Sequence, residues 1–211
     1  MKEKIKTIFK VIIKGVLELL YPKDNKCLIC GSPAEGICVK CRNSIVRCEE
    51  NEESIGYYKG VLKQLILKFK FEKDFNAGDI LVELLEEKIK AFDNEYILTF
   101  IPVSSKTMKK RGFNQCEYLA REIAFRNNYK VINTLKKVRE TKDQKTLSKK
   151  ERKENLIGAF EIINKEDILG KKIILIDDVI TTGATLREAK KMLKLSGVLQ
   201  INTLTIARTY I

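Results

Sequence analysis

The chain has 211 residues, of which 44% are hydrophobic and 33% are charged, and this predicts one soluble globular domain with a small additional module rather than a disordered or membrane-spanning protein. Its 41 Lys and Arg residues against 28 Asp and Glu give a net charge of +13, which favours phosphate-rich small molecules or nucleic acid as partners, although a genome-wide bias toward lysine explains the excess equally well. The chain contains no histidine, so His-based acid–base catalysis, His metal ligands and Ser-His-Asp triads are excluded.

Residues 1–22 are expected to form an amphipathic helix, the first of three predicted parts (1–22, 23–54 and 55–211). Apolar residues recur there at helical spacing opposite a lysine face, and Pro22 ends the pattern. Lysines interrupt the apolar stretch and no small-residue cleavage site follows. We therefore predict a cytoplasmic protein with neither signal peptide nor membrane span. Packing of this helix on the protein body or on a partner is favoured over docking on a membrane surface.

Residues 23–54 contain two CxxC motifs separated by seven residues. The four cysteines are Cys27, Cys30, Cys38 and Cys41. Paired thiolates on tight turns suit tetrahedral Zn²⁺, and four of them complete its coordination sphere, so we predict a structural zinc site. Disulfides and an iron–sulfur cluster are the weaker alternatives for a chain without a secretory signal. Cys48 and Cys116 fit no ligand spacing, and Cys116 is expected to pack as a small apolar residue.

From residue 55 onward, predicted helices and strands alternate. Hydrophobic periodicity predicts helices at residues 61–71, 80–92, 115–128 and 183–195, and strands at residues 98–103, 173–176 and 199–207. The hydrophilic run 136–155 is predicted to be a mobile loop. The apolar run at 173–176 is typical of a buried parallel strand, and the strand–helix–strand unit that it begins predicts an α/β fold, with a parallel sheet flanked by helices.

The residues best suited to ligand chemistry follow this buried strand. Two adjacent acids, Asp177 and Asp178, precede a loop and a helix start that consist of Val179, Ile180, Thr181, Thr182, Gly183, Ala184 and Thr185. Threonine hydroxyls, the close approach that glycine allows and the unpaired N–H groups of a new helix can hold an anion such as a sugar 5′-phosphate. Carboxylates repel phosphate but accept hydrogen bonds from ribose hydroxyls. We therefore expect a phosphoribose site, against the alternative of an ordinary strand-end turn.

Residues 173–186 resemble the diphosphate-sugar signature of type I phosphoribosyltransferases, and the four-Cys module ahead of them resembles the ComF family of competence-associated proteins. The likeness covers nearly the whole chain, and its most family-specific piece is the RGFNQ sequence at residues 111–115. The resemblance implies a type I phosphoribosyltransferase-like sheet and binding of phosphoribosyl pyrophosphate (PRPP) with Mg²⁺. By the same resemblance Asp177 and Asp178 hold the ribose and are the candidate catalytic residues, while residues 181–185 hold the 5′-phosphate. It also implies a role in DNA uptake beside a helicase-like partner.

Other segments supply candidate PRPP contacts. Residues 101–106 are predicted to form a turn that could present backbone N–H groups and a lysine to the diphosphate, although an ordinary strand-exit loop is an equal alternative. Residues 111–115 are equally consistent with ligand contact and with a helix start that uses Gly112 for the turn and Asn114 as the N-cap. The loop 139–146 resembles the lid of phosphoribosyltransferases more than a merely solvated basic loop. The candidate contacts in these segments are Val103, Ser104, Lys106, Arg111, Arg139 and Lys142.

Two functions from different classes follow. The first is displacement of diphosphate at C1 of the sugar through an oxocarbenium-like transition state, favoured by Mg²⁺ and cations on the departing diphosphate. The sequence shows no acceptor-binding signature, so the acceptor is open, as is the oligomeric state. The second is a non-catalytic protein that binds single-stranded DNA. Lysines interleaved with aromatic residues at 57–71 favour DNA, although an amphipathic core helix with its lysines outside explains this stretch more simply.

Overall fold

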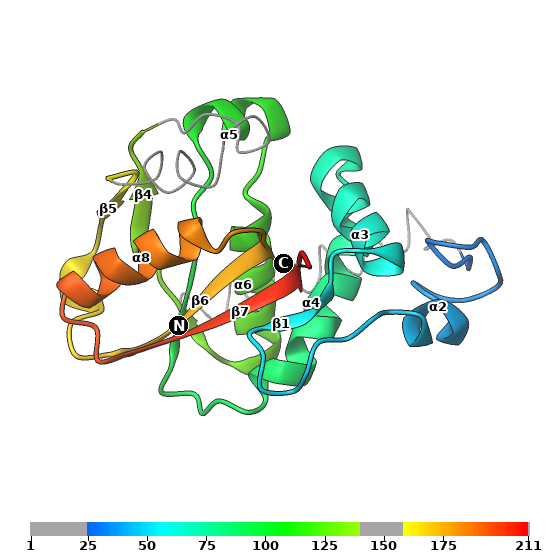
Figure 1. Ribbon diagram of the computed structural model, residues 1–211, viewed down its shortest axis with the longest axis horizontal. Coiled ribbons are helices and arrows are strands. Elements are labelled where there is room, and N and C mark those ends of the chain that lie inside the picture. The colour runs from blue at the N-terminus through cyan, green and yellow to red at the C-terminus, as the bar shows by residue number, and fades with distance from the viewer. Residues whose placement is uncertain (1–24, 140–157, 211) are drawn as a thin grey trace, which may run out of the picture.

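A five-stranded sheet, parallel throughout, lies at the centre of the fold (Figure 1). The computed structural model describes residues 25–139 and 158–210. The strands lie in the order β1 (Ser54–Tyr57), β7 (Gln200–Arg208), β6 (Lys172–Ile180), β2 (Ile97–Phe100) and β3 (Lys130–Val131). The carboxyl ends of all five strands therefore lie at one edge, where open parallel sheets bind their ligands. This confirms the predicted α/β class.

Strand β6 occupies the middle of the sheet, between β7 and β2. It pairs in register with β7 from Lys172, opposite Gln200, to Ile180, opposite Arg208. The side chains of residues 173–176 are fully buried. A strand covered on both faces needs consecutive apolar residues, and the Ile-Ile-Leu-Ile run meets that need.

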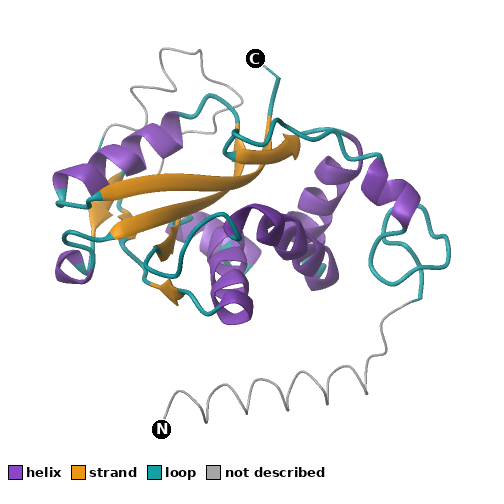
Figure 2. Ribbon diagram, turned by 90° about the horizontal axis from the view of Figure 1, so that it is seen from below, coloured by secondary structure: helices purple, strands orange, loops and turns teal. Residues whose placement is uncertain are grey.

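Helices cover both faces of the sheet (Figure 2). One face carries α3 (Gly60–Leu67), α4 (Phe75–Ile89) and α6 (Gln115–Asn127), and the other carries α8 (Ala184–Leu195) with the hairpin of β4 (Leu135–Lys137) and β5 (Phe160–Ile162). Side chains from α3, α4 and α6 share a core with Ile174 and Ile176 of β6. Side chains from α8 and the hairpin share a second core with Ile173 and Leu175. Alternate residues of β6 therefore contribute to opposite cores.

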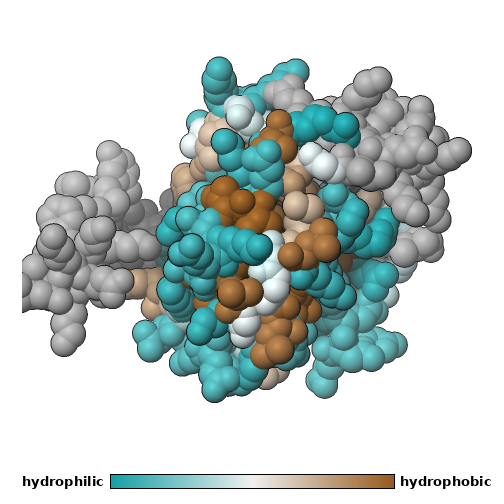
Figure 3. Space-filling view, turned by 90° about the vertical axis from the view of Figure 1, so that its left-hand side faces the viewer, coloured by the Kyte–Doolittle hydropathy of each residue, from teal (hydrophilic) through white to brown (hydrophobic). Residues whose placement is uncertain are grey.

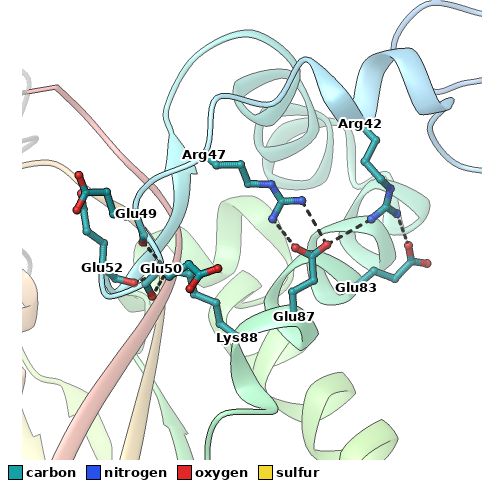
Figure 4. A network of polar contacts seen from close by, with 8 residues as sticks. All are labelled: Arg42, Arg47, Glu49, Glu50, Glu52, Glu83, Glu87 and Lys88. Atoms are coloured by element: carbon teal, nitrogen blue, oxygen red, sulfur yellow. Dashed lines mark hydrogen bonds and ion pairs between the residues drawn. The ribbon is translucent and has the colours of Figure 1, made fainter.

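The cysteine-containing segment is attached to α4 by charged side chains (Figure 4). Its short helix α2 (Val39–Asn43) carries Arg42, which donates to Glu83 at 2.9 Å and lies 3.5 Å from Glu87. Arg47 also pairs with Glu87, and Lys88 donates to backbone carbonyls of residues 49, 50 and 52. These ion pairs are partly exposed and contribute little stability singly. Buried Ile37 and Ile45 extend the core beneath them.

Two predicted helices differ from the structure at their ends. Helix α3 passes into a π-helical turn, η1 (Lys68–Glu72), which ends where Lys73 adopts a left-handed conformation with φ 56°. The helix predicted at 80–92 begins earlier, at Phe75, because Asp74 caps it by accepting a hydrogen bond from the N–H of Ala77. Asp74 thus marks a helix start that hydrophobic periodicity alone missed.

The strand predicted at 98–103 ends at Phe100 as β2. The N–H of Ile101 still donates to the carbonyl of Ile176, but Pro102 has no N–H to continue the ladder. Ser104 then caps a short helix, α5 (Ser105–Arg111), by accepting a hydrogen bond from the N–H of Thr107. The prediction of strand up to residue 103 is therefore wrong.

Other predictions fall partly outside the described residues. The helix predicted at 1–22 lies outside them, as does most of the loop predicted at 136–155, whose first two residues belong to β4. A short 3₁₀ helix, η3 (Lys165–Asp167), precedes β6. Within the part of the chain that the structure describes, each helix is too short or too polar to cross a membrane.

Hydrophobic side chains gather among hydrophilic ones on the face that lies at the left-hand side of Figure 1 (Figure 3). Three exposed leucines lie at this end of the molecule, at the last residue of α8 or in the turns beside it: Leu169, Leu195 and Leu199. Leu169 lies over Gly197, in the turn between α8 and β7. These turns lie at the amino-terminal edge of the sheet, away from the edge described next.

Candidate functional site

The two adjacent acids lie at the carboxyl end of β6, where the sequence places them. Asp177 and Asp178 are each 8% exposed. Their carboxylate oxygens and the sulfur of Cys116, on α6, all lie within 4.8 Å of one another. Successive strand residues ordinarily point to opposite faces, but here both acids reach the same helix. The result is a compact cluster of acidic groups beneath the surface.

The negative charge of Asp178 is compensated by a neighbouring cation. Lys70, on the π-helical turn η1, forms an ion pair with its Oδ2 atom, and the Nε2 atom of Gln115 donates to the same oxygen at 2.8 Å. Burial alone would raise the pKa of Asp178, but the ammonium of Lys70 and these hydrogen bonds lower it below its usual range. Asp178 is therefore ionised at neutral pH.

Asp177 has a different environment. Its Oδ1 atom accepts hydrogen bonds from the N–H of Asp178 at 2.8 Å and from the thiol of Cys116 at 3.5 Å. Burial, followed by the charge of Asp178, raises the pKa of Asp177 to about 7. Burial and the two carboxylates also raise the pKa of Cys116 well above its usual value, so it remains a thiol. The prediction that Cys116 packs as a buried small residue is confirmed, and it also serves as a hydrogen-bond donor.

The loop after β6 leads into α8 through a glycine. Gly183 is the N-cap residue, with φ 67°, and has no side chain that could cap the helix. Thr182 accepts a long hydrogen bond from the N–H of Ala184, 3.4 Å, and its carbonyl accepts one from Arg187. Helix α8 has 12 residues, so the positive end of its dipole and its free N–H groups point toward this loop. The arrangement offers backbone donors to an anion.

A pocket of about 350 Å³ adjoins this loop. Residues 181–183 line it together with residues 51–54 and two arginines, Arg187 and Arg208. Arg208 is paired with Glu52, and Arg187 holds the loop carbonyl of Thr182. The pocket thus combines hydroxyl and cationic groups with the carboxylates of Glu52 and Glu53, and only its side at residues 181–183 and Arg187 suits an anionic ligand.

The four cysteines predicted to bind zinc come together. Their sulfur atoms all lie within 4.8 Å of one another, and those of Cys30 and Cys38 are 3.6 Å apart. Tetrahedral Zn²⁺ with Zn–S bonds of about 2.3 Å places its sulfurs about 3.8 Å apart. Burial, followed by the neighbouring thiols, raises the pKa of Cys41 to about 12. A cation among the sulfurs would favour the thiolate form of Cys41 and lower this pKa. The spacing of the four sulfurs fits zinc.

Comparisons with known proteins agree with this architecture. Residues 80–209 match the family model described as "Phosphoribosyl transferase domain". The chain is 31% identical to "Competence protein F" of Haemophilus influenzae, over 86% of this chain and 84% of that protein. It is 30% identical to "Competence protein ComFC" of Streptococcus pneumoniae, over 90% and 91%, and 27% identical to "DNA utilization protein YhgH" of Salmonella typhimurium, over 87% and 84%. The chain belongs to the ComF family.

The RGFNQ sequence of this ComF chain forms the junction between α5 and α6. Gly112, with φ 84°, ends α5, and Asn114 caps α6 by accepting a hydrogen bond from the N–H of Cys116. Asn114 also donates to the carbonyl of Ile101, which ties the junction to the end of β2. Arg111 donates to Gln115, whose amide in turn reaches Asp178. The predicted helix start is confirmed, and the motif also orients one acid of the site.

The remaining candidate contacts are less closely joined to the acids. Ser104 is the cap of α5, and Lys106 lies exposed in its first turn, so residues 101–106 form a strand exit and helix start rather than an open turn. Val103 precedes them at the same sheet edge. Arg139 is exposed at the end of a described segment, and Lys142 lies outside the described residues.

Within the stretch 57–71, for which a core helix is a simpler expectation than DNA binding, Phe69 and Lys70 are both turned inward. Phe69 is 1% exposed and packs against Phe113 and Tyr118, so it is not available to stack on bases. Lys70 faces the acids of the ComF site rather than solvent. Helical periodicity could not have placed it there, because a π-helical turn changes which residues share a face.

Proposed function

We propose that this ComF-family chain binds PRPP at the carboxyl edge of its sheet and transfers the phosphoribosyl group in a Mg²⁺-dependent reaction linked to DNA uptake. The observation that carries the proposal is the position of two buried acids one short loop before a helix start whose N-cap residue is a glycine. Carboxylates that can accept from ribose hydroxyls and backbone N–H groups that can donate to a phosphate are then separated by one loop. This arrangement matches a phosphorylated ribose.

Each part of the ligand has a place in this proposal. The ribose hydroxyls donate to Asp177 and Asp178. The 5′-phosphate lies against the loop and accepts hydrogen bonds from backbone N–H groups and hydroxyls of Thr181, Thr182 and Thr185 with Gly183 and Ala184. The diphosphate points toward the end of β2, where Val103, Ser104 and Lys106 lie, and Arg111, Arg139 and Lys142 are further candidate contacts.

In the proposed reaction the bond between C1 and the diphosphate oxygen breaks while a nucleophile forms a new bond to C1. Positive charge develops on the sugar in the transition state, and the carboxylate of Asp177, when ionised, favours it. Bound Mg²⁺ would neutralise charge on the departing diphosphate. The acceptor can be a base, ammonia or an amine. The names of the relatives, competence and DNA utilization proteins, support a role in the handling of imported DNA.

The test is calorimetric titration of the full chain with PRPP and Mg²⁺, together with an assay of pyrophosphate release. We expect Asp177→Asn to weaken PRPP binding about 10–100-fold, since a hydrogen bond that involves a charged group contributes about 1.5–3 kcal/mol. Asp167→Asn, which changes an exposed acid on η3, is the matched control and should bind normally. Equal affinity in wild type and Asp177→Asn would remove the site assignment.

The same titration should depend on pH. Asp177, with a pKa of about 7, accepts from a hydroxyl best when ionised, so PRPP affinity should rise as the pH is raised through 7. The neighbouring ionisable groups do not change their protonation state near pH 7, because the pKa of Asp178 is lowered while those of Lys70 and Cys116 are raised. Asp177→Asn should lose this rise, and whatever pH dependence remains belongs to PRPP itself.

Binding of single-stranded DNA is the second candidate, favoured by the net charge of +13 and by exposed lysines beside aromatic rings. Lys59 lies 4.6 Å from the ring centroid of Tyr210, which stacks on Tyr57, and Lys63 lies 5.9 Å from that of Tyr58. Fluorescence anisotropy with an oligonucleotide at two salt concentrations tests this function. A steep loss of affinity with salt supports it, and absence of binding at low salt refutes it.

A further inference from the structure

Lys70 is an unusual neighbour for a pair of sugar-binding acids. Its side chain is 17% exposed and that of Asp178 is 11% exposed, so the ion pair between them is shielded from solvent. It is delivered by a π-helical turn, a rare element that often marks functional sites. Burial would lower the pKa of Lys70, but the carboxylate of Asp178 raises it, so the ammonium stays charged.

The groups around Lys70 have the composition of a metal site. One thiol and two carboxylates, from Cys116, Asp177 and Asp178, lie within 4.8 Å of one another and are all buried. Divalent ions such as Zn²⁺ and Co²⁺ bind this kind of mixed sulfur and oxygen set. The ammonium of Lys70 already contacts Asp178 in this cluster, with Gln115 as a second donor to the same oxygen.

We infer that Lys70 is a built-in cation of the acid pair, which keeps divalent metal ions out of the Cys116–Asp177–Asp178 cluster and leaves the two carboxylates able to accept ribose hydroxyls. Its role in metal exclusion stands on the cluster alone. Its role toward ribose rests on the proposed function. Lys70 is a positioning residue in this inference, because it acts through Asp178 and does not contact the ligand.

The chemistry explains why a lysine suits this place. A divalent ion bound by the two carboxylates would occupy the lone pairs that a diol needs, and would also deprotonate the thiol of Cys116. An ammonium carries one charge and three donors, so it neutralises Asp178 at one oxygen and leaves the rest of the pair open. The pair then selects a neutral hydroxyl donor over a metal ion.

The metal test uses the full chain loaded with zinc, titrated with Co²⁺ and followed by thiolate-to-cobalt absorption. Wild type should bind no Co²⁺ beyond exchange at the four-Cys cluster, whereas Lys70→Met should bind one further equivalent. Lys68→Met removes a lysine from the same turn, one that pairs with exposed Glu72, and should behave as wild type. Lys70→Arg keeps a cation and should also exclude Co²⁺. The added Cys116→Ala change should abolish the new thiolate band in Lys70→Met.

Two results would overturn the exclusion of metal. One is a Co²⁺ equivalent in the zinc-loaded wild type that disappears with Cys116→Ala, and this result does not depend on how any Lys70 variant folds. The other is absence of an extra equivalent in a Lys70→Met protein that melts cooperatively. Neither measurement involves PRPP, so the outcome is separate from the fate of the proposed function.

The ligand test compares PRPP with ribose 5-phosphate, which lacks the diphosphate. Lys70→Met should weaken both by a similar factor, roughly tenfold, because Asp178 loses the charged donor that positions its carboxylate for the ribose hydroxyls. A loss confined to PRPP would mean that Lys70 serves the diphosphate, which overturns its role toward ribose. If wild type binds neither compound, the proposed function fails, while the Co²⁺ result still decides whether Lys70 excludes metal.

Discussion

Asp178→Ala is expected to lower the free energy of unfolding by about 3 kcal/mol at neutral pH, because removal of one partner of a buried ion pair leaves an uncompensated charge. The stranded group is Lys70, whose side chain is only 17% exposed, and Gln115 loses its acceptor as well. Urea denaturation followed by circular dichroism measures the change.

A second substitution separates charge from packing in this prediction. Lys70→Met combined with Asp178→Leu removes both charges, and replacement of a buried pair by apolar groups is often nearly neutral. The double variant should therefore recover most of the lost stability. The deficit of Asp178→Ala should also shrink as the pH rises toward about 10, because the unfolded state then no longer binds the proton that the folded state has lost. A single variant as stable as wild type would contradict the buried ion pair.

Loss of the zinc site is expected to have a still larger effect. Cys41→Ser should abolish binding of one zinc ion per chain and lower the melting temperature by roughly 10 °C. Structural zinc contributes several kcal/mol to the free energy of folding, and each kcal/mol shifts the melting temperature of a chain of this size by about 2–4 °C. The core is affected because Cys41 and its neighbour Ile37 belong to the same hydrophobic cluster as α4. Metal analysis and thermal melts with and without chelator test this.

Cys48→Ser is the control for the zinc prediction, because Cys48 lies outside the four-sulfur cluster. It should retain the metal and respond to chelator as wild type does. Retention of zinc by Cys41→Ser, or an equal loss in Cys48→Ser, would show that the metal is held elsewhere or not at all.

The parts of this structure that follow from sequence are those fixed by local patterns. The run at 173–176 predicted the buried strand, although β6 continues through the two acids to Ile180, so Val179 and Ile180 belong to the strand and not to the predicted loop. The residues from Thr181 onward predicted the loop and helix start, and the cysteine spacing predicted a cluster of four sulfurs. In each case the signal lies within a few consecutive residues, where periodicity and turn chemistry act directly.

What sequence could not supply is the set of contacts between distant segments. Gln115 and Lys70 meet Asp178 across 63 and 108 positions of the chain, and no periodicity encodes such a meeting. The π-helical turn η1 also could not be predicted, because its sequence contains no proline or glycine that would indicate an irregular helix, and this turn changes the direction of the Lys70 side chain. Such a lysine is indistinguishable in sequence from those on the solvent face.

The pairing of β1 with β7 determines when the sheet can be completed during synthesis of the chain. Its Ser54 bonds to Thr205 of β7, 151 positions later, so the edge of the sheet is completed by the first and last strands of the described chain. At about 5–20 residues added per second, synthesis separates the two by roughly 8–30 s. During that time β1 can pair only with the preceding segment, through the bridge between Arg47 and Gly56, while the cysteine segment beside it is free to bind the predicted zinc ion. Completion of the sheet is therefore a late, long-range closure, and shortening the chain by its last ten residues would leave β1 without its partner.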